Sequence, residues 1–121
     1  MRLTPTEAEL QRAIMDLLRA ERVPAMRFNS GTLRNPRGVP VSFARWMDGS
    51  PVSGMADIMA LVHGRAVFLE VKAHGGKQRP AQVEFARWAL AAGACYAVVR
   101  SAADVRAALA GAEAAAFGGP A

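Results

Sequence analysis

The sequence predicts an α/β protein with one central mixed β-sheet flanked by helices, in the order α-β-(β)-β-β-α-β-α. Three observations support this prediction. Residues 58–72 hold two strand-like runs joined by a short turn, segments with helical spacing precede and follow them, and a short apolar run comes later at 94–99. A hairpin that is followed by a helix and a returning strand places strands of both directions in one sheet.

The first helix is predicted to begin at the N-terminal end of the chain. Thr4 is a good N-cap, Pro5 suits the first helical position, and Glu7 stands three residues after Thr4, as in a capping box. Apolar residues then recur at helical spacing and should face the core: Leu10, Ile14, Leu17 and Leu18. With Glu7 assigned to the cap, the residues alone give Glu9 no role beyond an exposed helix position.

The next segments are a short strand at 26–29 and a basic loop or ribbon at 31–54, which is rich in Gly and Pro. Within the ribbon, the run 41–46 could pair as a strand. Three of its residues are candidate phosphate contacts: Arg34, Arg37 and Arg45. Trp46 has two interpretations, since it could stack on a nucleic acid or pack onto the core.

A hairpin follows the ribbon. Residues 58–62 form an apolar strand, and residues 66–72 alternate with a period of two. The short link between them, His63-Gly64-Arg65, predicts a tight turn. One face of the second strand carries Val67, Leu69 and Val71, and the opposite face carries Phe68, Glu70 and Lys72.

The length of this turn decides which residues oppose each other. If His63-Gly64 is a two-residue turn, Val62 pairs with Arg65. Asp57 then lies directly across from Glu70, with their Cβ atoms about 5 Å apart on one face. A loop longer by two residues would make the pair diagonal on the same face, whereas a loop of odd length would separate the two carboxylates.

Two directly opposed carboxylates repel each other, so a bound divalent cation is expected between Asp57 and Glu70. Mg²⁺ prefers oxygen ligands and typically takes one or two carboxylates together with a substrate phosphate. Lys72 shares the face of Glu70 and could hold an attacking water or stabilise charge that builds on phosphorus. The competing interpretation makes Asp57 a strand cap and Glu70 and Lys72 a solvated edge.

A second helix is predicted from Pro80 to a stop at Gly93. Its apolar stripe contains Ala81, Phe85, Trp88, Ala89 and Ala92. Trp88 falls on this stripe and is therefore predicted to lie in the core. The apolar strand at 94–99 is expected in the interior of the sheet. A last helix begins near Ser101.

The chain is predicted to hold one domain at 1–111, followed by a disordered tail rich in Ala and Gly at 112–121. The formal net charge is +5, and only Lys72 and Lys77 of the 15 basic residues are lysines. Arginine grips phosphate through two nitrogens, so this balance favours a nucleic-acid partner, although codon bias would give the same composition.

The single cysteine, Cys95, excludes a disulfide within the chain and fits a reducing, cytoplasmic setting. No apolar run approaches the about 18 residues that a membrane span needs. The N-terminal ten residues lack the apolar centre of a signal peptide.

Asp57 followed by Glu70-Val71-Lys72 resembles the D…(D/E)-x-K signature of the PD-(D/E)XK nuclease superfamily. The wider context is similar to its VRR-NUC branch, the virus-type replication-repair nucleases, over about residues 9–105. The matching segments, in order, are Glu9-Leu10-Gln11, Asn29-Ser30-Gly31, Gly54-Met55-Ala56-Asp57-Ile58, Phe68-Leu69-Glu70-Val71-Lys72, and Pro80-Ala81-Gln82 with Gly93.

The resemblance implies an α+β, restriction-endonuclease-like core and hydrolysis of DNA phosphodiester bonds with Mg²⁺, or Mn²⁺ in its place. The ligands that it implies are Glu9, Asp57, Glu70 and the backbone carbonyl of Val71. Lys72 would be catalytic, and Gln82 would lie close to the site. Members that stand alone are typically bacterial or viral, act on duplex or branched DNA, and often form homodimers, which implies the cytoplasm of a bacterium or phage-infected cell.

The chain departs from the family pattern at two positions. Ala56 replaces the Pro that usually precedes the motif Asp, and Arg79 replaces a small hydroxyl residue before Pro80. Arg79 weakens the helix cap but adds a candidate phosphate contact. The candidate DNA-binding residues are Asn29, Arg34, Arg37, Arg45, Lys77 and Arg79.

Two other functions are compatible with the sequence. A DNA-binding module that does not cut would keep the fold within a larger complex, but it has no need of opposed carboxylates. A hydrolase of small phosphoesters would use the same metal chemistry, although the positive net charge favours DNA. Cleavage in replication, repair or recombination, at junctions or flaps, is the expected activity.

Overall fold

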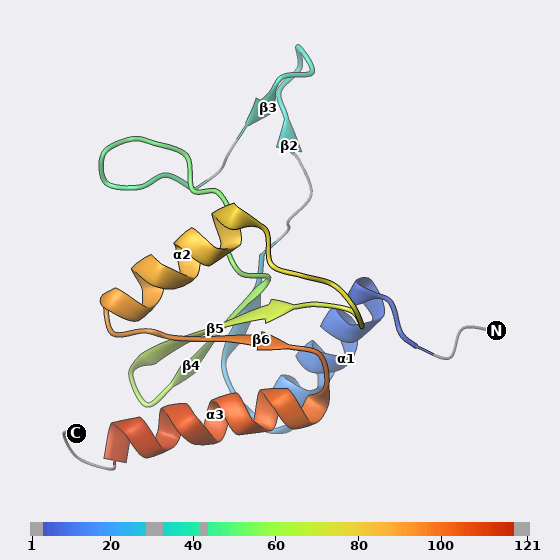
Figure 1. Ribbon diagram of the computed structural model, residues 1–121, viewed down its shortest axis with the longest axis vertical. Helices are drawn as coiled ribbons and strands as arrows, with labels where there is room; N and C mark the ends of the chain where they lie inside the picture. Colours follow the sequence, from blue (N-terminus) through green and yellow to red (C-terminus); the bar gives the residue numbers. More distant parts are fainter. Residues whose placement is uncertain (1–3, 29–32, 42–43, 118–121) are drawn as a thin grey trace.

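The computed structural model describes residues 4–28, 33–41 and 44–117, which form one mixed four-stranded sheet flanked by helices, with a separate two-stranded arm (Figure 1). The elements are α1 (Glu7–Ala20), β1 (Ala25–Arg27), β2 (Leu33–Arg34), β3 (Pro40–Val41), β4 (Ile58–Val62), β5 (Arg65–Val71), α2 (Pro80–Ala91), β6 (Cys95–Val99) and α3 (Ala102–Phe117). The strand order is β1-β4-β5-β6. Because β5 is antiparallel to β4 and parallel to β6, the predicted mixed sheet is confirmed.

The hairpin of β4 and β5 has the predicted two-residue turn. His63 and Gly64 both have positive φ, 47° and 80°, as a type I′ turn requires. Val62 therefore pairs with Arg65, and the ladder continues to Ile58 opposite Leu69. The register expected from the turn chemistry is confirmed.

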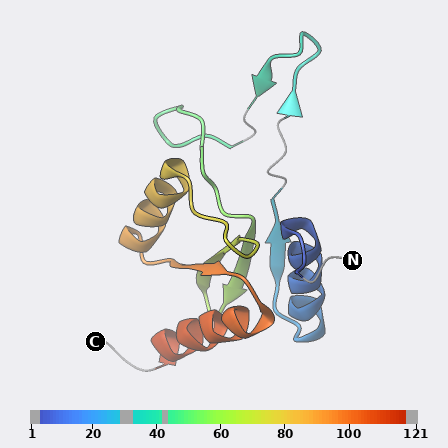
Figure 2. The ribbon, with the colours of Figure 1, turned by 45° about the vertical axis from the view of Figure 1, so that its right-hand side comes forward.

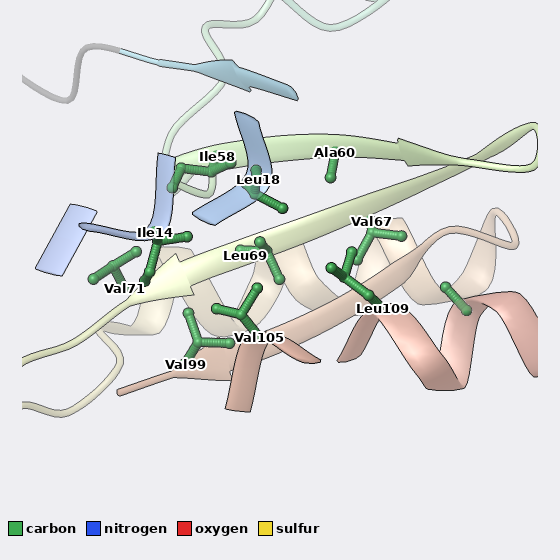
Figure 3. Packing of buried hydrophobic residues seen from close by; sticks show 11 residues of the cluster. Ile14, Leu18, Ile58, Ala60, Val67, Leu69, Val71, Val99, Val105 and Leu109 are labelled. Atoms are coloured by element: carbon green, nitrogen blue, oxygen red, sulfur yellow. The ribbon is translucent and has the colours of Figure 1, made fainter. Parts of the chain in front are cut away.

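Side chains from the two faces of the sheet enter two separate apolar clusters. On one face, Val67, Leu69 and Val71 pack against α1 and α3 in the larger cluster (Figure 3). On the opposite face, Phe68 packs edge-on against Phe85 of α2, with ring centroids 5.1 Å apart. The helices thus lie on both sides of the sheet, α2 on one and α1 with α3 on the other (Figure 2).

The N-cap of helix α1 lies two residues later than predicted. Thr6 is the N-cap: its hydroxyl accepts a hydrogen bond from the Glu9 nitrogen, and the Glu9 carboxylate accepts one from the Thr6 nitrogen at 3.1 Å. The assignment of the cap to Thr4 and Glu7 is therefore wrong. The sequence contains two overlapping boxes of the same type, and the apolar stripe is equally periodic for either start.

The apolar strand β6 lies at an edge of the sheet, not in its interior as expected. Its composition is apolar because both of its faces are covered. Cys95 and Ala97 pack against the larger cluster, while Tyr96 packs against the cluster under α2. The apolar composition of this strand therefore reflects packing on its two faces. It does not show that the strand is hydrogen-bonded to a neighbour along both edges.

Two further expectations are corrected. Trp88 is 55% exposed and contacts the ring of Trp46, because it lies beside the buried stripe of Phe85 and Ala89 and not within it. The tail expected from residue 112 is helical through Phe117, and Ala112 is only 1% exposed, since α3 continues across the larger cluster. Residues 118–121 lie outside the described part of the chain.

The arginine-rich ribbon forms a short hairpin arm of β2 and β3, which stands away from the sheet (Figure 1). The strand proposed at 41–46 is realised only in part, by the end of β3 and an isolated bridge between Arg45 and Pro51. Residues 42–43 lie outside the described residues. Among the helices that the structure describes, none is both long and apolar enough to cross a membrane.

Candidate functional site

The hairpin brings Asp57 and Glu70 together at one end of the sheet, as predicted. Asp57 directly precedes β4, and the last pair of the ladder, Ile58 with Leu69, places it beside Glu70. One carboxylate oxygen of Asp57, Oδ2, accepts a hydrogen bond from the backbone nitrogen of Val71 at 2.8 Å. Asp57 is 5% exposed and Glu70 only 1%. Two adjacent carboxylates are therefore buried together.

The environment of Glu70 disfavours its charged form. Its pKa is raised from 4.5 to about 9, first by burial, then by a hydrogen bond with Asp57 and by the charge of Asp57, against the attraction of Lys72. Its Oε1 is buried and has no hydrogen-bond partner. Without a cation, Glu70 therefore favours its protonated form, and its Oε1 lacks a hydrogen-bond partner.

The unsatisfied oxygen of Glu70 is one indication that these residues suit a divalent cation. A hard cation needs oxygen ligands, and it would compensate both the repulsion of the two carboxylates and the missing hydrogen bond. Among the described residues, however, there is no cluster of three or more His, Cys, Asp or Glu side chains that could hold a metal ion. The protein ligands at hand are thus two carboxylates and nearby backbone oxygen.

Lys72 completes the buried charged set. It follows β5, shares the face of Glu70, and is 5% exposed. Its charge lowers the pKa of Glu70, which places the ammonium within electrostatic reach of that carboxylate. The face predicted from the period-two alternation therefore carries all three polar groups.

A helix-one carboxylate other than the predicted Glu9, namely Glu7, lies within electrostatic reach of this site. The charge of Glu7 contributes to the raised pKa of Glu70, while the Glu9 carboxylate caps α1 through Thr6. Glu7 shares a helical stripe with the buried residues Gln11 and Ile14, and Glu9 does not. The spacing of Gln11, Ile14 and Leu18 at four, seven and eleven residues after Glu7 is the sequence signal that places Glu7 on this stripe.

The start of α2 is docked against the segment that leads into Asp57. Gly54 has φ +72°, and a Cβ at this position would overlap the backbone of Ala81 and Gln82. The side-chain oxygen of Gln82 accepts a hydrogen bond from the Arg79 nitrogen at 2.8 Å. Gln82 therefore caps the helix with its oxygen, a structural role that the sequence analysis did not assign.

Tyr96 borders the site and was missed. Its hydroxyl accepts a hydrogen bond from Nε2 of Gln78 at 3.1 Å. Burial raises its pKa to about 12, the charges of Glu70 and Asp57 add to the rise, and the bond from Gln78 opposes it. Tyr96 pairs with Phe68 across β5 and β6. Tyr96 comes close to the site only through the parallel pairing of β5 with β6, and no local sequence pattern predicts that pairing.

The other candidate residues are spread over the surface. Arg34 and Arg37 lie on the arm, Arg45 lies in the next loop, and Lys77 and Arg79 lie between β5 and α2, all exposed. Asn29 falls outside the described residues. Trp46 packs against Phe85 and Trp88, which supports its core interpretation.

Comparisons of the chain with protein-family models, with curated proteins and with solved structures find no match. Any inference about function therefore depends on the chemistry of the site itself. The function has to explain three features of the site: the two buried carboxylates, the unsatisfied oxygen of Glu70 and the buried Lys72.

Proposed function

We propose that the chain is a metal-dependent DNA endonuclease of the PD-(D/E)XK type, similar to its VRR-NUC branch and with a restriction-endonuclease-like topology. The observation that carries the proposal is the buried pair of Asp57 and Glu70, with one orphaned oxygen, beside the buried Lys72. A buried pair of carboxylates with an unsatisfied oxygen lowers the stability of the fold, and a bound cation would offset part of that cost. Proteins retain such costly arrangements at functional sites.

Asp57, Glu70 and the carbonyl of Val71 would hold Mg²⁺, with Mn²⁺ as a substitute. When bound, the ion would polarise the scissile phosphate and make water more acidic. From the first helix, Glu7 is the better candidate for a contact with the ion through water, because its charge reaches Glu70. Glu9 matches the family position, but its carboxylate is engaged in the cap of α1.

Lys72 would orient the attacking water and stabilise the negative charge that develops on the phosphoryl oxygens. Its burial strengthens this role, because an ammonium in a low-dielectric site acts more strongly on a neighbouring charge. Gln82 stands at the start of α2, where its amide nitrogen could reach a substrate oxygen while its carbonyl caps the helix.

The substrate would be duplex or branched DNA, processed in replication, repair or recombination in the cytoplasm of a bacterium or a phage-infected cell. The exposed arginines of the arm, with Arg45, Lys77 and Arg79, would hold the phosphate backbone. Cutting both strands would suit a homodimer, because one domain offers one site. A monomer on junction DNA at every working concentration would refute the dimer.

The alternative, a DNA-binding module without activity, explains the basic surface but not the buried carboxylates. A small-phosphoester hydrolase explains the carboxylates but not the basic arm. Bulk DNA should compete with a DNA substrate for the site, and it should leave hydrolysis of a small phosphoester unaffected if that is the true reaction.

The decisive experiment incubates labelled duplex, single-stranded, flap and four-way junction DNA with the protein in Mg²⁺, Mn²⁺ or EDTA. Asp57→Asn and Glu70→Gln should each lower the cleavage rate by about 100- to 1,000-fold, because they remove the charge but keep the shape. Glu84→Gln is the matched control, since Glu84 is an exposed carboxylate that pairs with Arg87 on α2.

Metal-dependent products that disappear in both site variants but persist in Glu84→Gln would support the nuclease. DNA binding without cleavage under any metal condition would instead favour the binding module. Equal cleavage by all four proteins would point to a contaminating nuclease and would refute the assignment of the site.

A further inference from the structure

The turn that follows Lys72 is closed by a side chain from another element. The guanidinium of Arg100 donates from Nη1 to the carbonyl of Ala73 at 2.8 Å and from Nη2 to the carbonyl of Gly76 at 2.7 Å. The turn is also bridged internally, because the Gly76 nitrogen donates to the Ala73 carbonyl at 2.9 Å. One planar cation thus holds both ends of the turn.

Arg100 is itself held in place. It follows β6 directly, and its backbone nitrogen donates to the carboxylate of Asp104 at the start of α3, at 2.8 Å. Its neighbour Val99 accepts a hydrogen bond from the backbone nitrogen of Lys72 at 3.1 Å. The guanidinium is therefore anchored to the strand that lies next to Lys72.

The closed turn lies against the aliphatic part of Lys72. A Cβ built at Gly76 would lie 3.6 Å from both Cβ and Cδ of Lys72, and 3.2 Å from the carbonyl oxygen of Ala73. Lys72 is almost entirely buried. A buried lysine stem has few other rotamers when backbone packs along it, so the position of the ammonium depends on the position of this turn.

We propose that Arg100 is a positioning residue: by closing the turn of residues 73–76 over the stem of Lys72, it directs the Lys72 ammonium toward Asp57 and Glu70. Its effect on catalysis rests on the proposed nuclease function, but its effect on Lys72 does not. Because Lys cannot reproduce a two-pronged contact at this geometry, the identity of residue 100 as Arg follows from the two carbonyls that it joins.

The two lysines of the chain give a direct test, because Lys77 is an exposed internal reference on the far side of the same turn. The full-length protein is treated with an amine-reactive acylating reagent, and the labelling rate at each lysine is measured by mass spectrometry. In Arg100→Gln, labelling of Lys72 relative to Lys77 should rise several-fold over the wild type. Arg106→Gln, which removes an exposed arginine of α3 bonded to Glu21, should leave the ratio unchanged.

A second variant perturbs the turn without touching Arg100. Gly76→Ala should crowd the Ala73 carbonyl and the Lys72 stem and raise Lys72 labelling, whereas Gly111→Ala in α3, which meets nothing within 4 Å, should not. This pair decides the question even if Arg100→Gln does not fold. An unchanged Lys72-to-Lys77 ratio in every folded variant of the turn would overturn the proposal.

Enzyme kinetics give a second, independent test. If the chain is a nuclease, Arg100→Gln should lower kcat by about 10- to 100-fold with little change in KM, as expected when a catalytic group moves by about 1 Å. A rise in KM alone would mean that Arg100 binds DNA, which contradicts a positioning role. If the wild type cuts no DNA, the nuclease proposal fails while the labelling ratio still decides the role of Arg100.

Discussion

The chain contains two hairpins with charged residues, and these residues are buried at one hairpin and exposed at the other. In β4–β5, Glu70 is buried and its neighbours Asp57 and Lys72 are nearly so. In the β2–β3 arm, Arg34 and Arg37 are exposed, and the arm stands away from the sheet (Figure 1). The first arrangement is costly without a partner and suits chemistry, whereas the second retains hydration and suits reversible contacts with phosphate.

The two hairpins are also stabilised differently. The tip of the arm is held by its own residues: the side-chain oxygen of Asn35 accepts hydrogen bonds from the nitrogens of Arg37 and Val39, at 2.9 and 3.0 Å. The β4–β5 hairpin is covered by helices on both faces and shares its site with α1 and β6. Mutations should therefore have local effects in the arm and long-range effects at the site.

The largest effect is expected from pH at Glu70. Its folded pKa of about 9 lies above its ordinary 4.5, so the stability that its proton contributes is complete below pH 4.5 and is lost as pH rises toward 9. In EDTA, the wild type should lose up to about 1.4 kcal/mol of unfolding free energy per pH unit in this window relative to Glu70→Gln, measured by urea denaturation.

Mg²⁺ should reduce this loss in the wild type and have no such effect in Glu70→Gln, because the ion replaces the proton on Glu70. Parallel stability curves for the two proteins across the window would show that Glu70 titrates normally and would contradict the buried pair. No comparable pH dependence is expected from changes in the arm.

The second effect concerns Lys72. Lys72→Met keeps the length of the stem but removes the charge, and it should lower kcat by about 100- to 1,000-fold while the fold is retained. The measurement is single-turnover cleavage at saturating protein. Lys77→Met should instead weaken DNA binding, most strongly at low salt, because Lys77 is exposed and would act as a single phosphate contact. Equal losses of kcat in both variants would argue against a special role for Lys72.

The third effect compares two glycines that both have positive φ. Gly54→Ala forces a Cβ into the backbone of α2 and should lower the free energy of unfolding by about 3 kcal/mol or more. Gly38→Ala, at φ +78° in the arm with nothing within 4 Å, should cost only the conformational strain, about 1 kcal/mol. Thermal melts would test this difference, and equal losses would show that α2 does not pack against Gly54.

The smallest effect is expected from the arm. Arg37→Gln should leave thermal stability and kcat unchanged but reduce the salt dependence of DNA binding by about one phosphate contact. Val39→Thr, an uncharged change on the same arm, is the control. An unaltered salt dependence in Arg37→Gln would remove the arm from the proposed DNA surface.

The sequence predicted the elements with strong local signals. The turn at His63-Gly64 and the alternation along β5 were sufficient to place Asp57 beside Glu70. Where local signals were duplicated, prediction failed: two capping boxes overlap at the start of α1, and the box is formed by Thr6 and Glu9, not by Thr4 and Glu7. The predictions that β6 is an interior strand and that Trp88 is buried were also wrong, because burial depends on neighbours that are distant in sequence.

The sequence by itself thus determined the register of one hairpin and the face on which Asp57, Glu70 and Lys72 lie, because backbone periodicity and turn geometry act over a few residues. Only the tertiary structure decided that the charge of Glu7 reaches Glu70, that Tyr96 borders the site, and that Arg100 closes the turn beyond Lys72. These contacts join segments far apart in the chain, and residue spacing carries no information about where such segments meet.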